Sequence, residues 1–91
     1  MIHSLVEKYQ KGAITDDHLV VECLHMLDPG DPGLVLGSLP DDILRRILWF
    51  ASEYLHGPMK TNYGVLPARD QVLAARRWIE QSFPLTANKT T

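Results

Sequence analysis

The chain has 91 residues, of which 45% are hydrophobic and 22% are charged, with a net charge of −2 and a pI near 6.0. This composition is typical of one small globular domain, and it excludes both a disordered chain and one that attracts nucleic acid by its overall charge. The apolar runs are too short to span a membrane and the start of the chain lacks the layout of a signal peptide, so we expect a cytoplasmic protein with no membrane partner. The single cysteine, Cys23, excludes an internal disulfide and a cysteine-based zinc site.

The first third of the chain predicts two amphipathic helices and a short helical turn. The first helix carries apolar residues at helical spacing, namely Ile2, Leu5, Val6 and Tyr9, and Gly12 is suited to end it. Thr15 is suited to cap a second helix that runs to about Leu27. The prolines and glycines of "DPGDPG", residues 28–33, predict a turn, from which Pro32 starts one short helical turn.

A third helix is predicted from about Leu39 to His56. Ser38 and Asp41 have the spacing of a capping box, in which a hydroxyl and an acid three residues later satisfy the first backbone N–H groups. The predicted apolar stripe of this helix comprises Ile43, Leu44, Ile47, Leu48, Ala51, Tyr54 and Leu55. Gly57 is placed to end the helix.

The last third predicts a loop over residues 57–67 and a fourth helix between Pro67 and Pro84. The apolar stripe of the fourth helix comprises Val72, Ala75, Ile79 and Phe83. No segment alternates as a strand does. We therefore predict an all-α fold, either a small four-helix bundle or an orthogonal helical array with one extra short turn. Residues 1–85 would form a single domain and residues 86–91 a flexible polar tail.

Two Glu-x-x-His pairs lie on the predicted second and third helices, with the spacing by which four-helix bundles hold two metal ions. The ligands of such a site for two metal ions would be Glu7, Glu22, His25, Glu53, His56 and Glu80. Helical periodicity places these residues opposite the apolar stripes, so we predict no interior metal and no other cofactor. A surface zinc site from His18, Glu22 and His25 would need a ligand from another chain, and the alternative is that these side chains are simply solvated.

Catalysis has two candidate nucleophiles. Cys23 lies in the apolar stripe of the second helix, where a thiol usually packs as a small hydrophobe, and Ser38 is explained as a helix cap. We therefore predict no catalytic site.

The segment "LGSLPDDILRRIL" carries two family resemblances. It resembles the start of the helix that bears the phosphopantetheine arm in acyl carrier proteins, which implies Ser38 as the attachment site. That family has Asp where this chain has Gly37, and an acidic helix where it has Arg45 and Arg46. The same segment and the later "ARRW" also resemble the two ends of an F-box, with a longer separation between them.

Trp49 is the residue that points most directly to a function. It lies on the polar side of the predicted third helix, one turn from Arg45 and from Glu53, and exposed Trp with Arg is typical of binding hot spots. We expect a non-enzymatic domain that binds a protein partner or itself through this face and the following loop. The predicted contact residues are Arg45, Arg46, Trp49, Glu53, His56, Met59 and Tyr63. The alternative is that Trp49 packs under residues 59–66 of its own chain.

The alternative function is nucleic acid binding through an arginine band on the third and fourth helices. The band would comprise Arg45, Arg46, Lys60, Arg69, Arg76 and Arg77. The first two helices could also serve as a helix-turn-helix. Asp16 and Asp17 would then open the recognition helix with the wrong charge for phosphates, which disfavours this alternative.

Overall fold

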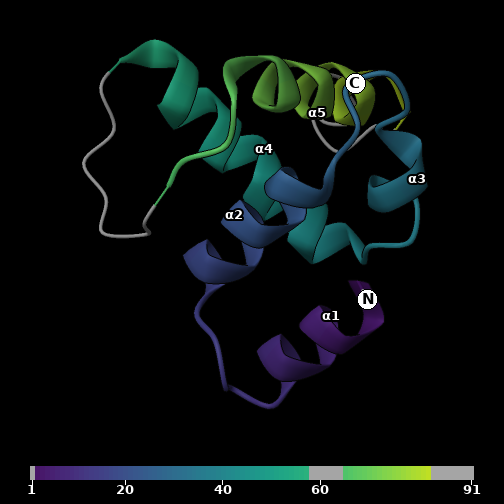
Figure 1. Ribbon diagram of the computed structural model, residues 1–91, viewed down its shortest axis with the longest axis vertical. Helices are drawn as coiled ribbons and strands as arrows, with labels where there is room; N and C mark the ends of the chain where they lie inside the picture. Colours follow the sequence, from purple (N-terminus) through teal and green to yellow (C-terminus); the bar gives the residue numbers. More distant parts are fainter. Residues whose placement is uncertain (1, 58–64, 83–91) are drawn as a thin grey trace, which may run out of the picture.

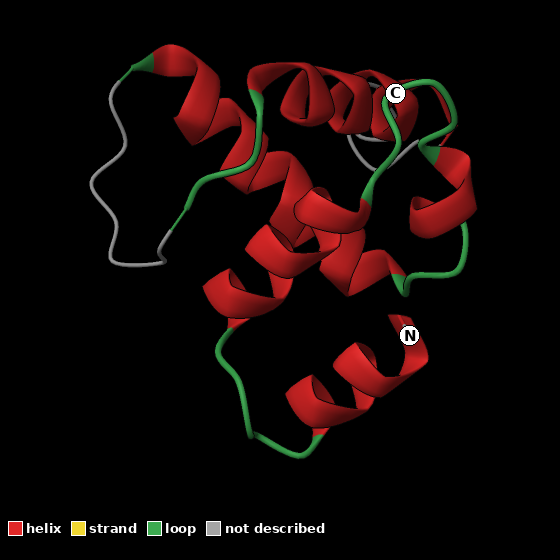
Figure 2. Ribbon diagram, in the orientation of Figure 1, coloured by secondary structure: helices red, strands yellow, loops and turns green. Residues whose placement is uncertain are grey.

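The computed structural model describes residues 2–57 and 65–82, and these ranges are entirely without strands (Figures 1 and 2). They form five helices: α1 (Ile2–Gln10), α2 (Asp16–Met26), α3 (Gly33–Leu36), α4 (Asp41–His56) and α5 (Arg69–Ser82). The predicted all-α fold with one extra short turn is confirmed. Of the helices in the described ranges, none is long and apolar enough to cross a bilayer. Phe83, Pro84 and the predicted tail lie outside the described residues.

Helix α4 is the longest helix and lies at the centre of the arrangement (Figure 1). Helices α2 and α5 both pack against α4 and contact each other, α1 packs on α2, and α3 packs on α5. In Figure 1, α2 and α5 lie oblique to α4 and do not run alongside it as in an up-and-down bundle. Of the two predicted arrangements, the helical array and not the four-helix bundle describes the molecule.

The apolar stripes of α2, α4 and α5 meet in one core. Its buried side chains, each at most 6% exposed, are Leu19, Val20, Val21, Cys23, Leu24, Leu27, Leu36, Leu39, Ile43, Leu44, Ile47, Phe50, Ala51, Val72, Ala75 and Ile79. The predicted stripes are thus confirmed in phase, with one correction on α4. Phe50 is buried although the predicted stripe omits it, whereas Leu48, Tyr54 and Leu55 are only partly buried. Phe50 follows Ile47 by three positions, so the same periodicity contained this signal.

The ends of α1 and α2 follow from local chemistry. Gly12 has a φ of 81°, its N–H donates to the Tyr9 carbonyl at 3.0 Å, and the Ala13 N–H donates to the Lys8 carbonyl at 2.8 Å. These two bonds form a Schellman motif, which needs a left-handed residue at this position and so favours glycine. Thr15 Oγ1 accepts a hydrogen bond from the His18 N–H at 3.2 Å, which confirms the predicted cap of α2.

The predicted capping box at the start of α4 is wrong. The helix begins at Asp41, and its cap residue is Pro40, in an extended conformation and without a side-chain hydrogen bond to the helix. The Ser38 hydroxyl instead donates to the Val35 carbonyl at 3.1 Å, at the end of α3. Pro40 inserts an extended residue between Ser38 and α4. The Ser38 hydroxyl therefore bonds to the preceding helix, α3, and not to α4. Acids in the first turn, Asp41 and Asp42, complement the positive end of the α4 dipole.

Asp16 joins three helices at one point. Its carboxylate forms an ion pair with Arg46 of α4, with Oδ2 and a guanidinium nitrogen 2.8 Å apart. A hydrogen bond to the same carboxylate, together with partial burial, raises the pKa of the Tyr9 hydroxyl on α1 above its ordinary value. No residue of α1 is fully buried, so this polar link supplements a half-buried apolar stripe in holding α1 on α2.

Gln71 joins the end of α2 to the start of α5. Its side-chain nitrogen donates to the Leu27 carbonyl at 3.1 Å and to the His25 carbonyl at 3.3 Å. Its side-chain oxygen accepts from the Ala68 N–H at 3.0 Å, which is the returning half of a capping box. One side chain therefore satisfies carbonyls at the C-terminus of α2 and an N–H at the N-terminus of α5.

Replacing Gln71 with alanine is expected to lower the free energy of unfolding by about 1–2 kcal/mol, because several hydrogen bonds at two helix ends are lost. Urea unfolding followed by circular dichroism measures this. Gln81, exposed on the same helix, is the matched control, and its replacement with alanine should change stability by less than about 0.5 kcal/mol. Equal effects of the two substitutions would contradict the role of Gln71.

Candidate partner-binding surface

Four exposed side chains form a continuous face along the outer side of α4. Arg45, Trp49, Glu53 and His56 recur about every turn and are all exposed, and we call them the Trp49 face. Trp49 is 54% exposed, so more than half of its side-chain and backbone surface meets solvent. Its position on the polar side of this helix agrees with the periodicity of the sequence.

An apolar margin accompanies the Trp49 face. Leu48 and Leu55 are only partly buried, and with Ser52 between them they follow the spacing i, i+4 and i+7 along one side of the face. The sequence prediction placed both leucines inside the core and so did not count them in the binding surface. They lie at the edge of the α4 stripe, where only the position of the neighbouring helices decides how much of each is covered.

The charges beside Trp49 differ in their partners. Arg45 and Glu53 form no ion pair within the described part of the chain, and they lie one turn before and one turn after Trp49. Arg46 points to α2 and pairs with Asp16, so it borders the face. Unpaired charges on either side of an exposed indole are suited to form the rim of an interface.

Two predicted contact residues, Met59 and Tyr63, lie outside the described residues. The same holds for most of the loop that was the alternative cover for Trp49. Trp49 is 54% exposed, and the alternative in which residues 59–66 cover it falls mostly on residues that the structure does not describe.

The predicted arginine band is interrupted by internal ion pairs. Helices α4 and α5 are neighbours, as the band requires. However, Arg46 pairs with Asp16, and Arg76 pairs with Glu80 at 3.3 Å on α5. These carboxylates offset part of the positive charge that phosphates would need, and Lys60 lies outside the described residues.

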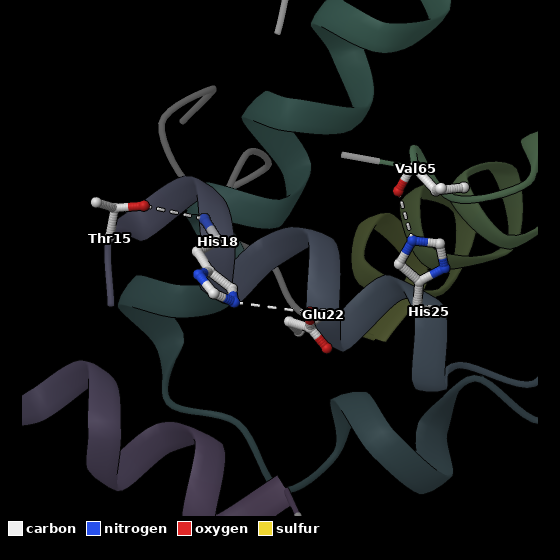
Figure 3. Close-up of polar contacts among 5 residues, drawn as sticks. All are labelled: Thr15, His18, Glu22, His25 and Val65. Atoms are coloured by element: carbon white, nitrogen blue, oxygen red, sulfur yellow. Dashed lines mark hydrogen bonds and ion pairs between the residues drawn. The ribbon is translucent and has the colours of Figure 1, made fainter. Parts of the chain in front are cut away.

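The residues of the predicted interior metal set all face solvent. Each of Glu7, Glu22, His25, Glu53, His56 and Glu80 is exposed. In the described residues, no group of three or more His, Cys, Asp or Glu side chains could hold a metal ion. Of the three predicted surface ligands, His18 and Glu22 lie together on α2, whereas His25 turns toward Val65 (Figure 3).

Neither candidate nucleophile is prepared for catalysis. Cys23 is completely buried, and burial in the apolar core, with a small contribution from the charge of Glu22, raises its pKa to about 12. The thiol therefore stays protonated at neutral pH and cannot act as a thiolate nucleophile. The hydroxyl of Ser38 donates to a backbone carbonyl, and no base is seen to orient it among the described residues.

The resemblance to acyl carrier proteins meets a steric difference at Gly37. A Cβ atom at this position would lie 2.6 Å from the carbonyl oxygen of Gly33, so the Asp of that family would need a different backbone path before Ser38. The two fragments that resemble an F-box lie on the α3–α4 junction and on α5. Comparison of the chain with protein-family models, with curated proteins and with solved structures found no match.

Proposed function

We propose that this protein is a small non-enzymatic interaction domain that binds a protein partner, or a second copy of itself, through the Trp49 face. The observation that carries the proposal is the exposed indole of Trp49 at the middle of α4, with Arg45 and Glu53 one turn away on either side. Trp and Arg dominate binding hot spots, because large rigid side chains gain contact area at a low cost in conformational entropy.

The mechanism is surface complementarity. A partner covers the ring of Trp49 and the half-buried Leu48 and Leu55 beside it, and meets Arg45 and Glu53 at the rim. Burying the exposed half of an indole, on the order of 100 Å², would contribute roughly 2–3 kcal/mol. The opposite charges of Arg45 and Glu53 at the rim would select the orientation of the partner more than they would add affinity.

We place this function in the cytoplasm. The only thiol of the chain, Cys23, is free and buried, so the fold does not depend on an oxidising compartment.

The test compares Trp49→Ala with Leu34→Ala. Leu34 is also an exposed large hydrophobic residue, at 74% exposure, but it lies on α3, which packs on α5, and so it is the matched control. Self-association is measured by sedimentation over a range of protein concentrations. If the partner is a different protein, it is first isolated by its binding to the immobilised wild-type chain. The affinity of each variant for that protein is then measured.

Trp49→Ala is expected to weaken this binding at least about thirtyfold, equivalent to about 2 kcal/mol, because the anchor of the interface is lost. Leu34→Ala should bind as the wild type does. Both variants should unfold with nearly unchanged free energy, since neither side chain lies in the core. Equal binding of the wild type, Trp49→Ala and Leu34→Ala would contradict the proposal.

A further inference from the structure

A histidine and a glutamate on the outer face of α2 have their ligand atoms close to the separation that zinc requires. His18 Nε2 and Glu22 Oε2 are 3.6 Å apart, and the two side chains are 52% and 48% exposed (Figure 3). Two ligand atoms bound to one tetrahedral zinc ion at its usual bond lengths are separated by roughly 3.3 Å. A movement of a few tenths of an ångström would therefore bring both atoms into the coordination of a single ion.

The start of α2 holds this pair in place. Residues four apart lie on the same face of a helix, one turn above the other. The backbone under His18 is fixed because its N–H donates to Thr15 Oγ1 at 3.2 Å, in the capped first turn. The side chains already point toward each other (Figure 3), so little conformational freedom would be lost on binding an ion.

The third candidate on this helix does not complete the site. His25 Nε2 lies 2.7 Å from the Val65 carbonyl oxygen, and its ring turns away from Glu22 toward Val65 (Figure 3). No set of three or more metal-binding side chains exists in residues 2–57 and 65–82. One chain therefore supplies two ligands, whereas a closed zinc site uses four.

We infer that zinc joins two copies of this chain across α2, with His18 and Glu22 of each copy as its four ligands. A two-fold axis through the ion brings the same pair from both copies, as in other symmetric dimers. Two imidazoles and two carboxylates form a tetrahedral nitrogen and oxygen set, and the two carboxylates neutralise the charge of the ion. The ion also offsets repulsion between chains that each carry a net charge of −2. This inference does not rest on the proposed function, because the Trp49 face lies on α4.

The test is sedimentation velocity of the full chain near neutral pH, with zinc chloride at one ion per two chains or with EDTA. We expect zinc to double the mass of the species that sediments in EDTA, which is 10.3 kDa for a monomer, and EDTA to reverse this change. His18→Gln and Glu22→Gln should each weaken zinc-dependent dimerisation by at least about a hundredfold, because each substitution removes two of the four ligands of the dimer. Mutation of residues that only hydrogen-bond to metal ligands already lowers metal affinity by up to about a hundredfold. Both side chains are half exposed, so circular dichroism should show both variants folded.

His25→Gln is the matched control, a histidine of the same helix that the proposed site does not use, and it should dimerise as the wild type does. The inference is overturned by any of three results: a wild-type chain that stays monomeric with zinc, a dimer that persists in His18→Gln or Glu22→Gln, or a dimer lost in His25→Gln. Dimerisation that survives Trp49→Ala would show that the zinc site and the Trp49 face act independently.

Discussion

Replacing Phe50 with alanine is expected to lower the free energy of unfolding by about 3–5 kcal/mol. Phe50 is 1% exposed, lies on the buried side of α4, and packs at a ring centroid distance of 6.2 Å from Tyr54. Truncation removes a large buried ring and leaves a cavity that close-packed neighbours fill only in part. A domain of this size has a margin of only several kcal/mol, so this variant should be close to unfolded at physiological temperature.

The adjacent residue supplies the control. Trp49→Ala removes an even larger ring, but from the solvent side of the same helix, and should change the free energy of unfolding by less than about 1 kcal/mol. Phe50→Leu keeps most of the apolar volume, so its loss in free energy of unfolding should lie between those of Phe50→Ala and Trp49→Ala. This variant should remain folded enough for the loss to be measured. Urea unfolding followed by circular dichroism distinguishes these outcomes. A larger loss for Trp49→Ala than for Phe50→Ala would show that the phase of α4 is wrong.

Cys23 is expected to react with iodoacetamide about a thousandfold more slowly in the folded protein than in the unfolded chain near pH 8. The reactive form is the thiolate, and burial raises the thiol pKa from 9.0 to about 12, which lowers the thiolate fraction by that factor. Complete burial also blocks the reagent. Mass spectrometry of timed samples, with and without concentrated urea, measures both rates.

A thiol moved to the surface tests the reason for this protection. In a Cys23→Ala chain that also carries Ser82→Cys, the new thiol lies at the exposed end of α5 and should react in the folded state nearly as fast as in urea. Comparable rates for folded and unfolded wild-type chain would contradict the burial of Cys23.

The raised pKa of Cys23 also fixes the direction of a pH effect. Because the folded pKa exceeds the unfolded one, the stability linked to this proton is fully present below about pH 9 and is lost as the pH rises toward 12. The Tyr9 hydroxyl, whose pKa is also raised, acts in the same direction above about pH 10. The urea midpoint of the wild type should therefore fall in alkali more steeply than that of Cys23→Ala.

The proposed binding surface was only partly predictable from the sequence. Helical periodicity placed Trp49, Arg45 and Glu53 on the polar side of their helix, and the structure shows them exposed. Periodicity could not show that Leu48 and Leu55 stay partly uncovered, because that depends on where α2 and α5 cross α4. Nor could it show that the predicted contact residue Arg46 has an internal partner, since Asp16 lies thirty residues earlier in the chain.

The helices, their phases and two of their ends could all be predicted from the amino-acid sequence. These features arise from interactions within a few residues: the recurrence of apolar side chains, the Thr15 cap and the left-handed turn at Gly12. Contacts between polar groups that are distant in the chain could not be predicted, and examples are the hydrogen bonds of Gln71 to α2 and of His25 to Val65. This difference arises because helical periodicity fixes only the direction in which a side chain points from the axis of its own helix. The packing of separate helices fixes what that side chain then meets.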